Sequence, residues 1–94
     1  MLNKQQLIGT WESNDDPTLG STSVDFKEND TLTYTIHLEK KDQIINLVYW
    51  VKDDYLFTDQ PSSPNIEKSK AYIKNDRLYI SYGAFKVVYT KNMI

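Results

Sequence analysis

This sequence contains no cysteine, and its single histidine is His37. The side chains that remain most able to take part in binding or catalysis are its tyrosines. A cysteine nucleophile and a metal site built from several histidines are therefore excluded by composition. The sequence also contains no glycine-rich phosphate loop, no nucleophile elbow and no calcium-loop spacing of acidic residues. We therefore expect no metal site, no cofactor and no enzymatic activity.

Four tyrosines fall at positions predicted to face the inside of the protein. A buried tyrosine combines a large apolar ring with a hydroxyl that needs a partner, and several such hydroxyls can orient a small molecule. The alternative is that these residues belong to the core and that their hydroxyls are satisfied within the protein. The candidate ligand-binding residues are Tyr34, Tyr49, Tyr82 and Tyr89.

The elements that would position these tyrosines are strands, because apolar residues alternate with polar ones from position 10 onward. Residues 2–8 can form one helical turn with Asn3 as N-cap and Gln6 as its capping-box partner. We expect one all-β domain over residues 1–94. It is a small antiparallel up-and-down meander of seven to eight strands that forms a closed or nearly closed barrel after the helical turn. A first strand from position 10 is followed by strands at residues 21–26, 31–38, 44–51, 55–58, 68–74, 77–82 and 84–90.

The turns between these strands test the register, because a slip of one residue would move every apolar side chain to the opposite face. Turns at residues 28–30, 40–41, 75–76 and 83–84 all keep the apolar side chains together. The turn at 40–41 would set Ile36 beside Ile45 and Tyr34 beside Leu47, and the turn at 75–76 would pair Ile73 with Leu78. We expect the inward side chains to fill most of the lumen and to leave at most a partial pocket at the end away from Trp11.

The stretch Gly9-Thr10-Trp11 resembles the signature that opens lipocalins and related small barrels. FKENDTLTY (26–34), VKDDYLF (51–57) and IKNDRLYISY (73–82) are similar to the strand–turn units of small bacterial lipocalin-like, or calycin-type, domains. The resemblance implies that Trp11 is a structural plug at one end of the barrel and that Gly9 allows a tight turn beneath it. It also implies a cation from the last strand across the tryptophan ring, and here the nearest basic residue is Lys91 rather than an arginine.

Apolar residues are also predicted on the outer face of the barrel, where they are candidates for partner binding. Cover by the N-terminal turn or by the loop at residues 61–64 is the alternative. We expect a non-catalytic binding protein that uses this face for a protein partner or for self-association. The alternatives are a carrier of a small apolar ligand in the barrel mouth and an inhibitor or immunity-type protein. The outer-face residues are Ile44, Val48, Trp50 and Phe57.

The charge is small overall, at −2, but it is unevenly distributed. Residues 1–67 contain five lysines and twelve acidic residues, whereas residues 68–94 contain five lysines, Arg77 and one acidic residue. We interpret this asymmetry as neighbouring strands of opposite charge and expect no binding of nucleic acid. There is no apolar run of about 20 residues and no signal-peptide core, so we expect no membrane span. We expect a cytoplasmic protein, or a periplasmic or secreted one if a leader was removed.

Overall fold

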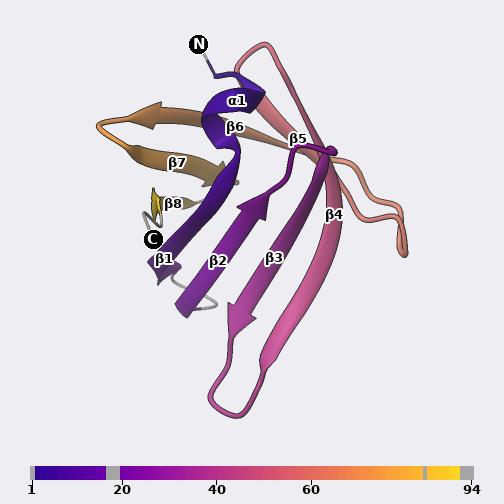
Figure 1. Cartoon of the computed structure of the whole chain (residues 1–94), viewed down its shortest axis with the longest axis vertical. Helices are drawn as coiled ribbons and strands as arrows, with labels where there is room; N and C mark the ends of the chain where they lie inside the picture. The colour runs from indigo at the N-terminus through magenta and orange to yellow at the C-terminus, as the bar shows by residue number, and fades with distance from the viewer. Residues whose placement is uncertain (1, 17–19, 84, 92–94) are drawn as a thin grey trace.

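The computed structural model in Figure 1 describes the backbone of residues 2–16, 20–83 and 85–91 and the side chains of residues 2–13, 21–81, 83 and 86–91. Its eight strands are all antiparallel, follow one another in chain order and close into a barrel when the last strand pairs with the first. The predicted all-β up-and-down barrel with a short N-terminal helical turn is confirmed. The elements are α1 (Lys4–Leu7), β1 (Gly9–Asp16), β2 (Gly20–Phe26), β3 (Thr31–His37), β4 (Asp42–Lys52), β5 (Tyr55–Asp59), β6 (Glu67–Lys74), β7 (Arg77–Tyr82) and β8 (Phe85–Lys91).

Two of the hairpins close through two-residue turns, at residues 53–54 and 75–76. All four turn residues have positive φ, between 53° and 64°. A tight hairpin turn that matches the twist of its strands needs this left-handed conformation at both central positions, and Asn and Asp adopt it more readily than most residues. The strand pairing predicted from the turn at 75–76 is confirmed, as in the pair formed by Ile73 and Leu78.

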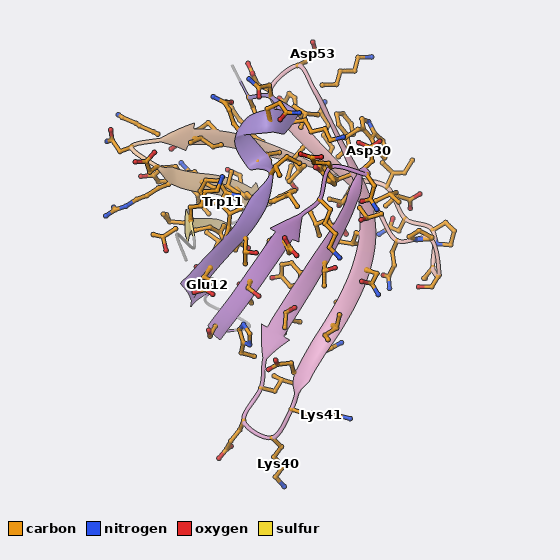
Figure 2. The ribbon with its side chains drawn as sticks, in the orientation of Figure 1. Trp11, Glu12, Asp30, Lys40, Lys41 and Asp53 are labelled. Atoms are coloured by element: carbon orange, nitrogen blue, oxygen red, sulfur yellow. The ribbon has the colours of Figure 1, made fainter. Side chains whose placement is uncertain are left out.

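The predicted two-residue turn at 40–41 is wrong. The connection between β3 and β4 spans residues 38–41, and Tyr34 pairs with Ile45 instead of Leu47. Lysine is poorly suited to positive φ, so this hairpin closes through a longer loop, and Figure 2 shows Lys40 and Lys41 pointing outward at its tip. The register differs from the predicted one by two residues, which leaves the same side chains facing the lumen.

The helical turn α1 covers one end of the barrel. Its predicted capping box is confirmed, with Asn3 Oδ1 accepting from Gln6 N and Gln6 Oε1 accepting from Asn3 N, both at 3.1 Å. Lys4 Nζ lies 2.6 Å from Asp30 Oδ1 in the β2–β3 turn. Leu2 N donates to Asp54 Oδ1 in the β4–β5 turn at 2.9 Å. These contacts fix α1 across the end of the barrel at which β1 begins.

Trp11 lies beneath α1 and is only 2% exposed. Its indole Nε1 donates to the Leu7 carbonyl at 2.8 Å. Lys91 Nζ, from the last strand, lies 5.2 Å from the centroid of the tryptophan ring and donates to the Ile8 carbonyl at 2.8 Å. Gly9 has a φ of 125°, and a Cβ there would come within 2.9 Å of Lys91 Cε. The glycine therefore gives the chain both the conformation and the space that bring the lysine over the ring.

The contribution of Lys91 can be measured against a matched lysine on the same strand. We expect Lys91→Met to lower the free energy of unfolding by about 2 kcal/mol, because it removes both a charged hydrogen bond to a backbone carbonyl and a cation–π contact. Lys86 is exposed and lies 5.4 Å from the Tyr72 ring, so Lys86→Met is expected to cost about 0.5 kcal/mol. Urea unfolding followed by tryptophan fluorescence gives both values, and equal losses would contradict the role given to Lys91.

Candidate functional site

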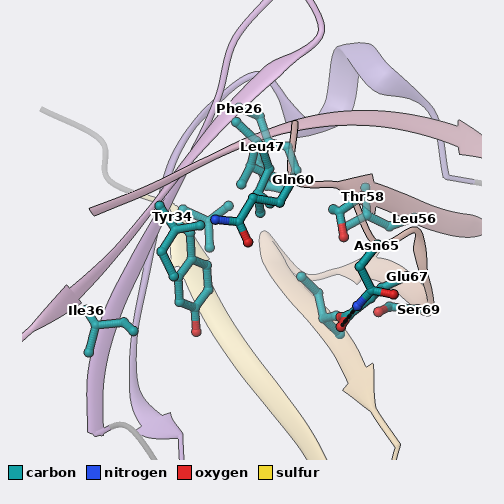
Figure 3. Close-up of a pocket in the computed structure, with 14 residues that line it drawn as sticks. Phe26, Tyr34, Ile36, Leu47, Leu56, Thr58, Gln60, Asn65, Glu67 and Ser69 are labelled. Carbon is teal, nitrogen blue, oxygen red and sulfur yellow. Dashed lines mark hydrogen bonds between the residues drawn. The ribbon is translucent and has the colours of Figure 1, made fainter. Parts of the chain in front are cut away.

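The lumen holds a cavity of about 300 Å³ toward the end of the barrel opposite α1 (Figure 3). The cavity lies at the end away from Trp11, where at most a partial pocket was expected. The cavity is bordered by strands β2 to β7 and by the β5–β6 connection. Its lining consists of Val24, Phe26, Leu32, Tyr34, Ile36, Ile45, Leu47, Leu56, Thr58, Gln60, Asn65, Glu67, Ser69 and Ile80.

One wall of the cavity is apolar and comes mainly from β2, β3 and β4. Because side chains alternate between the two faces of a strand, every second residue of these strands points into the lumen. Val24, Leu32 and Ile36 are buried, while Ile45 and Leu47 are half-buried against the cavity. A hollow with such walls holds water poorly and favours an apolar occupant.

The opposite wall changes from apolar to polar along β5 and β6. The inward positions of β5 run from Leu56 through Thr58, and Gln60 continues the same face into the connection. Along β6 they run from buried Ala71 to Ser69 and then to exposed Glu67 at the start of the strand. The polar ends lie farthest from α1, so the cavity has an apolar depth and a polar mouth.

The mouth is organised by hydrogen bonds within the β5–β6 connection. Asp59 Oδ1 accepts from Asn65 N at 2.9 Å, and Asn65 Nδ2 donates to Glu67 Oε1 at 3.4 Å. Gln60 Nε2 donates to Ser62 Oγ at 3.3 Å. In Figure 3 the Gln60 side chain reaches between the Tyr34–Leu47 side of the cavity and the side that carries Thr58. These polar residues were not among the candidates predicted from the sequence, although the period-2 pattern of β5 and β6 carries the signal.

The structure places the four candidate tyrosines in different surroundings. Tyr34 lines the cavity, whereas Tyr49 and Tyr89 are buried in the core and do not contribute to its lining. Tyr49 Oη donates to the Lys27 carbonyl at 2.8 Å. The side chain of Tyr82 lies outside the described residues. Tyr34 is thus the tyrosine among the described side chains that is positioned to contact a molecule in the cavity.

The outer-face candidates lie along one side of β4 and on the neighbouring strand. Trp50 is 40% exposed and stacks on Phe57, with ring centroids 5.4 Å apart and an interplanar angle of 4°. Val48 is half-buried, and Ile44 is 61% exposed. Ile44 lies six residues from Trp50, which corresponds to about 20 Å along a strand. The structure therefore brings Trp50 and Phe57 together and leaves Ile44 apart from them.

The single histidine of the sequence lies on the surface. His37 is exposed, and its Nδ1 lies 3.2 Å from Asp42 Oδ1. Among the described residues, no group of three or more His, Cys, Asp or Glu side chains is arranged to hold a metal ion.

Tyr72 and Tyr79 stack on each other across β6 and β7, with centroids 4.7 Å apart. In the part of the chain that the structure describes, no helix has the length and apolar character needed to cross a lipid bilayer.

Comparison with known proteins gives no match for this chain among family models, curated proteins or solved structures. The candidate site is accordingly defined by geometry: a closed antiparallel barrel, one end covered by α1, and a cavity toward the other end. Its lining combines an apolar wall with a polar mouth. This arrangement is suited to holding a small molecule.

The buried tyrosine beneath the β2–β3 turn should titrate abnormally. Burial, and then the nearby carboxylates of Asp30 and Glu28, raise the pKa of Tyr49 above its usual value of 10.0. Because the pKa is higher in the folded state, this residue's contribution to stability is fully present below pH 10 and is lost as pH rises through the folded pKa. We expect the absorbance difference at 295 nm between the wild type and Tyr49→Phe to titrate above pH 10. A difference that titrates at or below pH 10 would contradict this.

Proposed function

We propose that this protein is a non-catalytic binding protein with a lipocalin-like barrel, and that it takes one small, largely apolar molecule into its cavity. The observation that carries the proposal is the cavity of about 300 Å³ with an apolar wall at the end of the barrel that α1 leaves uncovered. Ligand pockets begin at about this volume, and an apolar cavity of about 150 Å³ is sufficient for a molecule the size of benzene.

The closed end of the barrel supports the lipocalin-like assignment. A helical turn precedes the first strand, Trp11 is buried beneath it, and a cation from the last strand lies over the ring. This is the arrangement that the resemblance of Gly9-Thr10-Trp11 implies, with Lys91 in place of an arginine. Because α1 and Trp11 close this end, the opposite end is the one left for a ligand to enter.

The affinity expected for a simple ligand is low. Burying each methylene contributes about 0.8 kcal/mol, and the lost freedom of the ligand offsets several kcal/mol of that gain. With an offset of about 4 kcal/mol, a molecule with eight to twelve carbon atoms would therefore bind with a dissociation constant on the order of 0.1–10 mM. This range can be measured by fluorescence and by calorimetry.

A neutral apolar dye tests this proposal directly. We expect N-phenyl-1-naphthylamine to brighten on addition to the protein, with saturation at one dye per chain. Leu47→Trp, which adds a large side chain to the cavity wall, should weaken dye binding at least tenfold. Leu38→Trp makes the same change at a residue that is 50% exposed and should leave binding unchanged. Brightening that does not saturate, or equal loss in both variants, would contradict the proposal.

The outer face supplies a second candidate function, namely self-association or binding of a protein partner. A tryptophan that is 40% exposed and stacked on a neighbouring ring is typical of contact surfaces, where aromatic residues are enriched. The helical turn α1 is tied to the turns at the closed end, and it leaves Trp50 40% exposed. Phe57 adds a second ring to the same surface.

Substitution of Trp50 separates this candidate from a general effect of surface aromatics. We expect the wild type to self-associate in sedimentation velocity as concentration rises, and Trp50→Ala to remain monomeric over the same range. Tyr72→Ala is the matched control, because Tyr72 is also 40% exposed and stacks on Tyr79 across two strands. Both variants should unfold cooperatively. A wild type that is monomeric at every concentration, or equal effects of the two substitutions, would contradict self-association through this face.

A further inference from the structure

We propose that the cavity selects amphipathic molecules that carry a primary ammonium group on an apolar body, with the ammonium placed beside Glu67. The inference rests on the proposed ligand-binding function and adds the chemical class of the ligand. Among the described residues that line the cavity, Glu67 is the only one with a charged side chain, and no lysine or arginine contributes to the lining. The site therefore offers a negative charge at the mouth and no positive one.

The orientation of the ligand follows from the gradient along β5 and β6. Leu56 and Ala71 are buried in the depth of the barrel, and Ser69 pairs with Leu56, whereas Thr58 and Glu67 pair with each other and lie nearer the mouth. Burial of an apolar tail contributes the most binding free energy when the tail passes the polar rim and lies against the wall formed by β2, β3 and β4. The polar head is then left at the level of Glu67, where it stays partly solvated.

The groups at the mouth include the hydrogen-bond acceptors that an ammonium needs. A protonated amine offers three N–H donors and no acceptor. A carboxylate has about four lone-pair sites, of which the 3.4 Å hydrogen bond from Asn65 Nδ2 uses one at Glu67. The Thr58 hydroxyl, on the residue that pairs with Glu67, can also accept, and so can the hydroxyl of Ser69, two residues deeper on the same wall. An ammonium at this level can therefore find a charged acceptor and neutral acceptors together.

The charges next to the mouth favour the same sign of ligand. Asp59 precedes the connection and does not line the cavity, but its hydrogen bond from Asn65 N keeps a second carboxylate beside a lining residue. Lys68 follows Glu67 but faces outward, with its Nζ 4.1 Å from the centroid of the Tyr55 ring. The positive charge of Lys68 therefore offsets the negative charge of Glu67 less than its neighbouring position in the sequence suggests. A ligand with a carboxylate head would meet Glu67 without a cation in the lining, so we expect such molecules to bind worst.

The test uses three ligands that differ only in their heads: octylammonium, octanol and octanoate at pH 7. Each is titrated against the bound neutral dye, and the dissociation constant is obtained from displacement. We expect octylammonium to bind about 3- to 10-fold more tightly than octanol, a range that suits an exposed carboxylate, and octanoate to bind more weakly than octanol. The preference for ammonium should shrink at high salt, because screening weakens exposed charge pairs.

Variants of Glu67 assign the preference to that residue. The preference is measured as the ratio of the dissociation constant of octanol to that of octylammonium. We expect Glu67→Gln to reduce this ratio to less than twofold. Glu67→Asp retains the charge and should keep most of the preference. Glu28→Gln removes the same charge from the turn at the closed end and should leave the ratio unchanged. This control separates a local contact from the effect of net charge. A preference that persists in Glu67→Gln, or that is lost equally in Glu28→Gln, would overturn the proposal.

The outcomes also distinguish this proposal from the proposed function. If the dye binds at one per chain and the three ligands compete equally, the selectivity is wrong and the binding function stands. If octanoate competes best, the same conclusion holds. If neither the dye nor any of the octyl compounds binds, the proposed function is wrong and the selectivity is wrong with it.

Discussion

The contact of Trp11 with both ends of the chain is the interaction on which the rest of the structure depends. The indole donates to the helical turn through the Leu7 carbonyl, and Lys91 from the last strand lies over the ring and donates to the Ile8 carbonyl. The described pairing of β1 with β8 consists of Trp11 with Lys91 and Glu12 with Thr90. This short seam lies beside Trp11, so the same contact that seals the end also supports closure of the barrel.

Because the barrel is closed at one end, its cavity lies toward the other end. Because α1 and Trp11 occupy the end at which β1 begins, the space left by the inward side chains lies toward the other end. The walls there follow the alternation of each strand, and on β5 and β6 that alternation passes from apolar to polar residues toward the mouth. A cavity of this shape has an apolar depth and a polar entrance without any residue being placed in an unusual conformation within it.

Local chemistry explains which parts of this fold can be predicted from the sequence. The capping box of Asn3 and Gln6 and the tight turn at 75–76 involve residues whose side chains favour those conformations, and both are confirmed. The turn at 40–41 has two lysines, which specify no tight turn, and there the predicted register was wrong by two residues. The position of the cavity, at the end away from Trp11, matches the partial pocket that the sequence allowed, but its size could not be predicted, because the volume depends on the summed sizes of side chains from six strands and on the curvature of the barrel. The polar mouth was predictable in principle from the inward alternation of Thr58 and Glu67.

The central claim is that a small amphipathic molecule enters the barrel at the end opposite Trp11, and nuclear magnetic resonance tests it most directly. A titration with octylammonium would follow the methyl groups of the cavity wall, the side-chain amide of Gln60 and the two indole N–H signals. The account predicts saturable shifts for the Ile36 and Leu47 methyls and for the Gln60 amide, with the indoles of Trp11 and Trp50 nearly unchanged. Shifts largest at Trp50, with the cavity methyls unmoved, would contradict it.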